Sequence, residues 1–76
     1  MNPRVKKVTP TKNYELELIF TNEEKKQFDL KPYLDFGVFS ELKEPSVFYS
    51  AKVEYGTVTW DNGADICPDT LYLESK

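Results

Sequence analysis

The sequence contains no histidine, one cysteine and three glycines among its 76 residues, and it has no long apolar run. Without histidine, the chain lacks the side chain best suited to proton transfer near neutral pH, so Ser-His-Asp and Cys-His arrangements are excluded. A single cysteine excludes an internal disulfide, as is typical of proteins from a reducing compartment. No run approaches the roughly 18 to 20 apolar residues of a membrane span, and the first residues do not resemble a secretory signal. We therefore expect a cytoplasmic protein that is not an enzyme and contacts no membrane.

Common ligand-binding motifs are also missing, including a GxGxxG turn, a Walker-type loop and a CxxC pair. Asp61, Asp65 and Asp69 recur every four residues, and hard cations bind converging carboxylates. We expect these aspartates on a hairpin rather than a helix, where the spacing does not align them and each position favours aspartate locally. Lone Cys67 is expected to be a small buried residue. No metal or cofactor is expected, and a divalent-cation site is the alternative.

The charge is mildly acidic and unevenly distributed, with ten Lys and Arg against thirteen Asp and Glu. Residues 1–38 carry a net charge of +1, and residues 39–76 carry −4. Such a chain is repelled by nucleic acid unless it gathers cations locally. A basic N-terminal arm, Arg4, Lys6, Lys7 and Lys12, could do so. The arm lacks aromatic residues for base stacking, and lysines protecting an edge strand explain it equally well. Nucleic-acid contact is expected only indirectly.

Period-two alternation of apolar and polar residues predicts three strands in the first half of the chain. The predicted strands are Val5–Thr9, Tyr14–Phe20 and Lys25–Asp29. In the first strand, Val5 and Val8 break the alternation, which is typical of a β-bulge. In the second strand, Ile19 is the apolar exception on a polar face, so we expect that face to be partly covered there.

The middle of the chain changes to helical spacing. A short helix is predicted over about Lys31–Phe36, because a proline suits its first turn and Gly37 can end it. Residues 38–42 predict one or two further helical turns, which Pro45 closes. Residues 46–50 predict another short turn that carries apolar side chains into the core.

The second half predicts three more short strands, separated by turns. These strands are Ala51–Tyr55, Thr57–Trp60 and Ala64–Ile66. Gly56 makes the first turn, and Asn62-Gly63 predicts a two-residue type I′ turn, because both residues tolerate the positive φ that it requires. Pro68 suits the first position of a C-terminal helix, with Asp69 in its positive first turn.

These elements predict a single domain over residues 1–76 with an α+β fold. We expect a small meander-type antiparallel sheet of about five to six strands. Short helices lie between the third and fourth strands, and a short helix follows the last strand. The reversal at Asn62 is expected to fold the chain back so that the Trp60 ring lies in the core.

A candidate interaction surface surrounds the last two turns and consists of Tyr55, Trp60, Asn62, Asp65 and Asp69. Aromatic residues concentrate at protein interfaces. Core packing is the favoured interpretation for Trp60, whereas Tyr55, beside a turn glycine, is the better candidate for exposure. A free strand edge offers a second route to a protein partner.

The whole chain resembles the prokaryotic domain-of-unknown-function family DUF2442. The resemblance is carried by PRVKKV at residues 3–8, the strand and Phe-Asp pair at residues 14–29, GVFSELKEP at residues 37–45, and GTVTWDNGADICPDTLY at residues 56–72. It implies a small bacterial α+β protein without an established activity, and some similar domains precede a helix-turn-helix. The resemblance also implies a gene setting, since stand-alone members often lie beside another small gene, an arrangement similar to that of toxin–antitoxin pairs. The matching family residues are Trp60, Asn62, Gly63, Asp65, Pro68 and Asp69.

Our leading hypothesis is a non-catalytic protein-interaction module, the antitoxin-like or regulatory half of a two-gene pair. Its partner would be the neighbouring gene product or a second copy of the chain. One alternative is a nucleic-acid-associated regulator that works with a helix-turn-helix from another chain. Another is a small-ligand sensor that uses the surface around Trp60.

Overall fold

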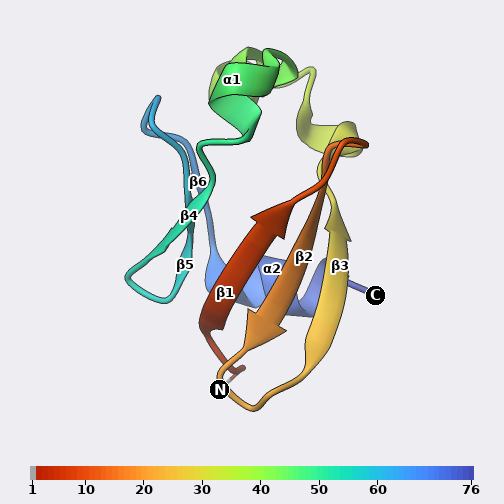
Figure 1. Cartoon of the computed structure of the whole chain (residues 1–76), viewed down its shortest axis with the longest axis vertical. Coiled ribbons are helices and arrows are strands. Elements are labelled where there is room, and N and C mark those ends of the chain that lie inside the picture. The colour runs from red at the N-terminus through yellow and green to blue at the C-terminus, as the bar shows by residue number, and fades with distance from the viewer. Residues whose placement is uncertain (1) are drawn as a thin grey trace.

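Two three-stranded antiparallel sheets form the β-structure of the computed structural model, which describes residues 2–76 (Figure 1). The first sheet has the order β1-β2-β3, namely β1 (Val5–Pro10), β2 (Glu15–Phe20) and β3 (Lys25–Asp29). The second has the order β4-β5-β6, namely β4 (Lys52–Glu54), β5 (Thr57–Thr59) and β6 (Asp65–Ile66). The predicted α+β class and the six strands are confirmed. The strands divide into two sheets rather than one, with the short helices between them in the chain.

Three short helical elements connect the sheets at one end of the molecule (Figure 1). They are η1 (Lys31–Tyr33), η2 (Gly37–Lys43) and α1 (Pro45–Phe48), and α2 (Pro68–Glu74) follows β6. The helix predicted over Lys31–Phe36 is only one 3-10 turn, because Phe36 is extended and Gly37 begins the next element with a φ of 49°. The helical turns predicted over residues 38–42 are confirmed as η2, which ends at Lys43 just before Pro45. Pro45 also begins the further turn predicted there, α1, as its fixed φ favours. Within residues 2–76, no helix is both long and apolar enough to cross a bilayer.

The core lies between the inner face of the first sheet, α2 and the second sheet. Alternation along β2 turns its three large apolar side chains inward, as the sequence predicts. In Figure 1, α2 lies behind the first sheet, so its buried leucine meets that face. The largest fully buried side chains are Phe20, Phe28, Phe48, Leu16, Leu18, Leu30, Leu42, Leu71 and Val58.

The turn after β5 reverses the chain as predicted, but with a different geometry. The Gly63 N–H donates to the Trp60 carbonyl and the Trp60 N–H to the Ala64 carbonyl, both at 3.0 Å, so the loop has three residues. Gly63 has a φ of 89°, whereas Asn62 is not among the residues with positive φ. This is a type I turn followed by a G1 bulge, so the predicted type I′ turn at Asn62-Gly63 is wrong.

The type I′ geometry occurs one turn earlier in the chain. Glu54 pairs with Thr57 across a two-residue loop, and the loop residues Tyr55 and Gly56 have φ values of 54° and 77°. Asparagine and glycine are the usual residues here, because a bulky side chain is strained at positive φ. The β4–β5 hairpin therefore holds a tyrosine at a backbone position that tyrosine rarely adopts.

Candidate interaction surfaces

Trp60 belongs to the core and not to the predicted interaction surface. Its side chain is only 2% exposed, and its ring lies edge-on to Phe39. The indole N–H donates to the carbonyl of Phe48 at 3.2 Å, which satisfies the polar atom of the buried ring. Core packing, the interpretation favoured from the sequence, is confirmed. The buried ring is therefore not accessible to a partner or a small ligand.

The side chain of Asn62 connects the β5–β6 turn to η2. Its side-chain Nδ2 donates to the carbonyl of Val38 at 3.3 Å and to the carboxylate of Glu41 at 3.1 Å. Its Oδ1 accepts the N–H of Ala64 at 3.1 Å. These three bonds use both ends of the amide, so the residue ties β5 and β6 to η2.

The other three predicted surface residues are exposed, but they lie on different elements. Tyr55, 92% exposed, lies at the tip of the β4–β5 hairpin, which projects from the body of the molecule in Figure 1. Asp65 lies on β6. Asp69 lies in the first turn of α2 and accepts a hydrogen bond from Asn2 at 3.3 Å. The structure therefore leaves Tyr55 as the one exposed aromatic residue of the predicted set.

Cys67 is exposed, so the expectation that it is buried is wrong. The alternation of β6 explains its position, because Ile66 points inward and its neighbours on both sides point outward.

The three aspartates that recur every four residues do not form a metal site. Asp61, the first of them, lies 3.5 Å from the ammonium of Lys52. Within residues 2–76, no three His, Cys, Asp or Glu side chains are placed to hold a metal ion.

The predicted basic arm is dispersed by the bulge in β1. The register of β1 on β2 shifts between Val5 and Lys7, which confirms the predicted irregularity. Lys6 forms an ion pair with Glu23 at 2.8 Å. The hydrogen bond from Lys6, together with its charge, holds the pKa of the Glu23 carboxyl below its usual value. This cation is thus already paired within the chain.

Arg4, the first cation of the arm, is turned toward the second sheet. Its guanidinium Nη1 lies 3.5 Å from the carbonyl oxygen of Tyr55. Its stem covers Gly56 so closely that a β-carbon there would lie 2.6 Å from Cδ of the arginine. Lys12 lies in the turn after β1. The four cations therefore do not converge on one surface.

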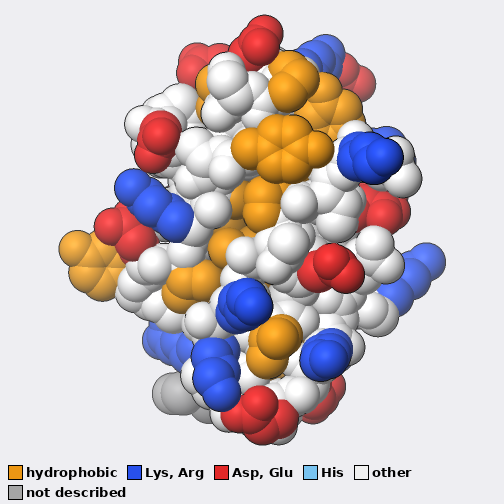
Figure 2. All heavy atoms as spheres, in the orientation of Figure 1, with side chains coloured by type: hydrophobic (Ala, Val, Ile, Leu, Met, Phe, Trp, Pro, Cys, Tyr) orange, Lys and Arg blue, Asp and Glu red, His pale blue; other side chains and the backbone are white. Residues whose placement is uncertain are grey.

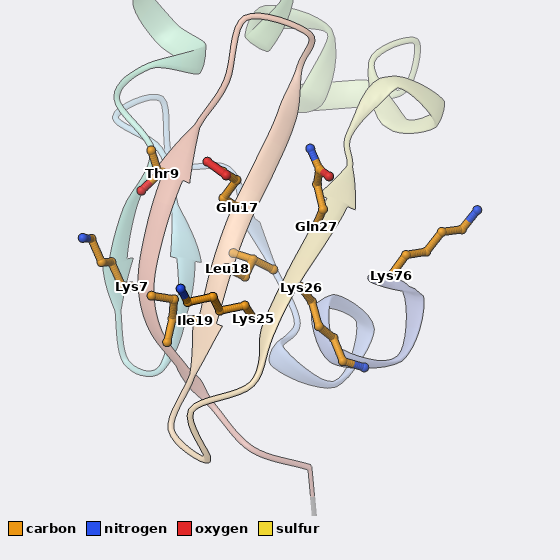
Figure 3. A pocket seen from close by; sticks show the side chains of 9 residues that line it. All are labelled: Lys7, Thr9, Glu17, Leu18, Ile19, Lys25, Lys26, Gln27 and Lys76. Atoms are coloured by element: carbon orange, nitrogen blue, oxygen red, sulfur yellow. The ribbon is translucent and has the colours of Figure 1, made fainter.

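The outer face of the first sheet carries a hollow that the sequence analysis missed. It is open, with a volume of about 360 Å³, and α2 lies on the opposite face of the sheet (Figure 1). One row across the strands aligns Lys7, Ile19 and Lys25. The next row aligns Thr9, Glu17 and Gln27. Figure 2 shows this face with cationic side chains around an apolar one, and Figure 3 shows the lining residues from close by.

The one sequence signal for this hollow was Ile19, the apolar residue on the polar face of β2. The side chain is half-buried, as expected. No helix covers it within residues 2–76, so its partial burial comes from the neighbouring side chains of the sheet. Aligning Lys7 and Lys25 with it required the cross-strand register, which the bulge in β1 changes.

Lys76 pairs with the outer edge of β3 in this same sheet. The Gln27 N–H donates to the Lys76 carbonyl at 2.8 Å, and the Lys76 N–H donates to the Gln27 carbonyl at 2.9 Å. This exchange of two bonds is the pattern of an antiparallel pair. It places the Lys76 side chain at the rim of the hollow, on the side opposite Lys7 (Figure 3).

Comparison with known proteins gives a family but no characterised relative. No curated protein and no solved structure matches this chain. Residues 5–76 match the model of the family described as "Protein of unknown function (DUF2442)", which covers the strands, the helical segment and α2. The chain therefore belongs to the DUF2442 family.

Proposed function

We propose that this protein is a non-catalytic protein-interaction module, the regulatory, antitoxin-like half of a two-gene pair. Its partner is the product of the neighbouring gene, and the partner docks on the outer face of the β1–β3 sheet. The absence of histidine supports a role without proton-transfer chemistry. The gene arrangement implied by the family resemblance supports the choice of partner.

The outer face of the first sheet, which no helix covers in the described part of the chain, is the observation that carries this proposal. A sheet with one face on the core presents a broad, rigid surface on the other. Here that surface is hollowed and has half-buried Ile19 near its middle, between exposed polar side chains. An apolar centre within a polar rim is the usual anatomy of a protein interface.

Co-expression with the adjacent gene product tests the proposal. We expect the tagged protein to retain its partner through purification, and we expect Ile19→Arg to abolish retention by placing a charge in the centre of the face. Val38→Arg is the matched control, because Val38 is an exposed apolar residue on η2. Far-UV circular dichroism checks that both variants are folded. Failure to co-purify, with no growth effect from either gene alone, contradicts the proposal.

The two alternatives receive less support. A nucleic-acid regulator would use the basic arm, but Lys6 is paired with Glu23 and Arg4 lies against the β4–β5 turn. A ligand sensor around Trp60 would need an accessible indole, and that ring is buried with its N–H bonded. Neither alternative has a surface that its predicted residues form together.

A further inference from the structure

We infer that the hollow on the first sheet binds an acidic segment of the protein partner, with Lys7 and Lys25 contacting carboxylates on either side of Ile19. The inference rests on the proposed function and adds the chemistry of the docking segment. It is carried by charge complementarity and by the arrangement of the lining residues.

Most of the lysines that form no ion pair within residues 2–76 lie around the hollow. Five of its nine lysines form ion pairs with Asp or Glu in the described structure. Lys7, Lys12, Lys25 and Lys76 form none within residues 2–76. Three of these four line the hollow, and only Lys12 lies elsewhere. In a chain with an excess of acidic residues, an uncompensated cationic site of this kind favours an anionic partner.

The order of side chains across the sheet suits a segment with carboxylates flanking an apolar residue. Lys7 and Lys25 lie on the two outer strands, with Ile19 on the strand between. Strands pair at about 4.8 Å, so the two lysine backbones are about 10 Å apart. In Figure 3, Lys25 extends over the sheet toward Ile19, while Lys7 lies at the side of the hollow. Both side chains have the length and freedom to reach a bound carboxylate.

The second row sets a limit to the acidic segment. Glu17 lies between Thr9 and Gln27, and its exposed carboxylate repels an anion at that end of the hollow. Thr9 and Gln27 supply neutral hydrogen-bonding groups there. Carboxylates of the partner are therefore favoured over the Lys7–Lys25 row, and neutral groups over the Glu17 row.

The lining favours an acidic polypeptide over nucleic acid. Proteins that bind single strands stack bases on aromatic side chains, and no aromatic residue lines this hollow within the described chain. Lysine, isoleucine, threonine and glutamine instead match the charged and aliphatic groups of a peptide.

The test uses a fluorescein-labelled peptide, Glu-Glu-Val-Glu-Glu-Val-Glu-Glu, blocked at both ends, and its counterpart with Gln for every Glu. We expect fluorescence anisotropy to detect binding of the Glu peptide only, with affinity falling as salt rises. The Lys7→Glu/Lys25→Glu variant should bind at least about 10-fold more weakly. Lys12→Glu is the control for net charge, because Lys12 lies outside the hollow, and it should change affinity less than about two-fold. Lys12→Glu/Lys76→Glu adds the change at the rim residue Lys76. Glu17→Gln should tighten binding.

Three outcomes of the binding measurements would overturn the inference. The first is no binding of the Glu peptide to the wild-type chain. The second is an equal loss in Lys12→Glu and in Lys7→Glu/Lys25→Glu, because net charge and not the hollow would then explain binding. The third is equally tight, Lys7- and Lys25-dependent binding of single-stranded DNA of the same charge. If the adjacent gene product still co-purifies with Lys7→Glu/Lys25→Glu, this inference fails while the proposed function stands. If the adjacent gene product does not co-purify with the wild-type chain, the proposed function itself is contradicted.

Discussion

The turn between β2 and β3 and the turn between β5 and β6 have the same backbone hydrogen bonds. In each, a buried aromatic residue, Phe20 or Trp60, accepts a bond from the third residue after it and donates to the carbonyl of the fourth. The two distances are 2.9 Å in the first turn and 3.0 Å in the second. In each, the central asparagine, Asn22 or Asn62, accepts the N–H two residues later at 3.1 Å. Two segments 40 positions apart in the chain thus adopt one local design.

The two turns differ in how the asparagine amide is used. Asn22 donates to the carboxylate of Glu24 at 2.6 Å, within the turn itself. Asn62 donates to Val38 and Glu41, more than twenty residues earlier in the chain. The first turn is therefore held by local groups, and the second also by contacts that exist only in the folded protein. Equal local geometry does not imply equal dependence on the rest of the fold.

Removal of the aromatic anchors has the largest expected effect. Trp60→Ala and Phe20→Ala should each lower the free energy of unfolding by about 3–5 kcal/mol, because both leave a large cavity in the core. Trp60→Phe, which keeps an aromatic ring and loses the bond to Phe48, should cost clearly less. Urea unfolding followed by far-UV circular dichroism measures all three. A loss below about 1 kcal/mol in Trp60→Ala would contradict its place in the core.

Substitution of the two asparagines separates the local turn from the tertiary one. Asn62→Ala should lower the free energy of unfolding by about 2 kcal/mol, and Asn22→Ala by about 1 kcal/mol, because only Asn62 also bonds the helical segment. Urea unfolding again supplies the measurement. Equal losses in the two variants would show that the bonds to η2 contribute nothing to stability.

The third loop position provides a smaller effect of opposite sign in the two turns. Glu23 and Gly63 have φ values of 71° and 89°. Gly63→Ala should destabilise by about 1 kcal/mol through backbone strain alone, because a β-carbon there meets no atom within 4 Å. Glu23→Gly should be about 0.5 kcal/mol more stable than Glu23→Ala, which loses the same ion pair with Lys6, since relief of strain exceeds the entropy gained by the unfolded chain. Thermal unfolding of the three variants checks the signs, and a stabilising Gly63→Ala would refute the strain argument.

The smallest expected effect is a dependence on pH confined to the first turn. The hydroxyl of Tyr72 donates to Glu24 at 2.7 Å, and with Asn22 it holds the pKa of that carboxyl below its ordinary value of 4.5. Because the folded-state pKa is lowered, this stabilisation is full above about pH 4.5 and is lost as pH falls through the lower folded value. Alanine occupies the equivalent position, residue 64, in the second turn and does not titrate.

Melting temperatures of the wild-type chain, Tyr72→Phe and Asn62→Ala between pH 7 and pH 3 measure this effect. We expect Tyr72→Phe to lose less stability than the wild type on acidification. Asn62→Ala should keep the wild-type slope, although its melting temperature is lower throughout. A wild-type slope in Tyr72→Phe would place the acid sensitivity in other carboxylates.

Local pattern predicted most of the secondary structure. β3 has the predicted bounds. β2 begins one residue after its predicted start, and α2 begins at Pro68, as predicted. The β1 bulge was visible as broken alternation. These features follow from side-chain periodicity and from the restricted φ of proline, which act within a few residues. Burial of Trp60 was also predicted, because the chain reversal at Asn62 is expected to direct the large indole ring into the core.

Local pattern could not predict the turn types or the hollow. Asn62-Gly63 is compatible with two loop geometries, and the amide bonds from Asn62 to the helical segment accompany the one observed. The row of Lys7, Ile19 and Lys25 depends on pairing between three strands. Tyr55 has a positive φ against its own preference, next to Gly56, on which Arg4 packs.

The amino-acid sequence alone therefore specifies six strands and which of their side chains point into the core. It also shows that no histidine is available for proton transfer. Folding decides that the strands form two sheets and that Lys6 is neutralised by Glu23. It also decides that Lys7 and Lys25, on either side of Ile19, have no ion-pair partner among residues 2–76. The physical reason is range. Periodicity and backbone preference act between neighbours in the chain, whereas register, ion pairing and surface shape depend on residues that become neighbours only when the sheets form.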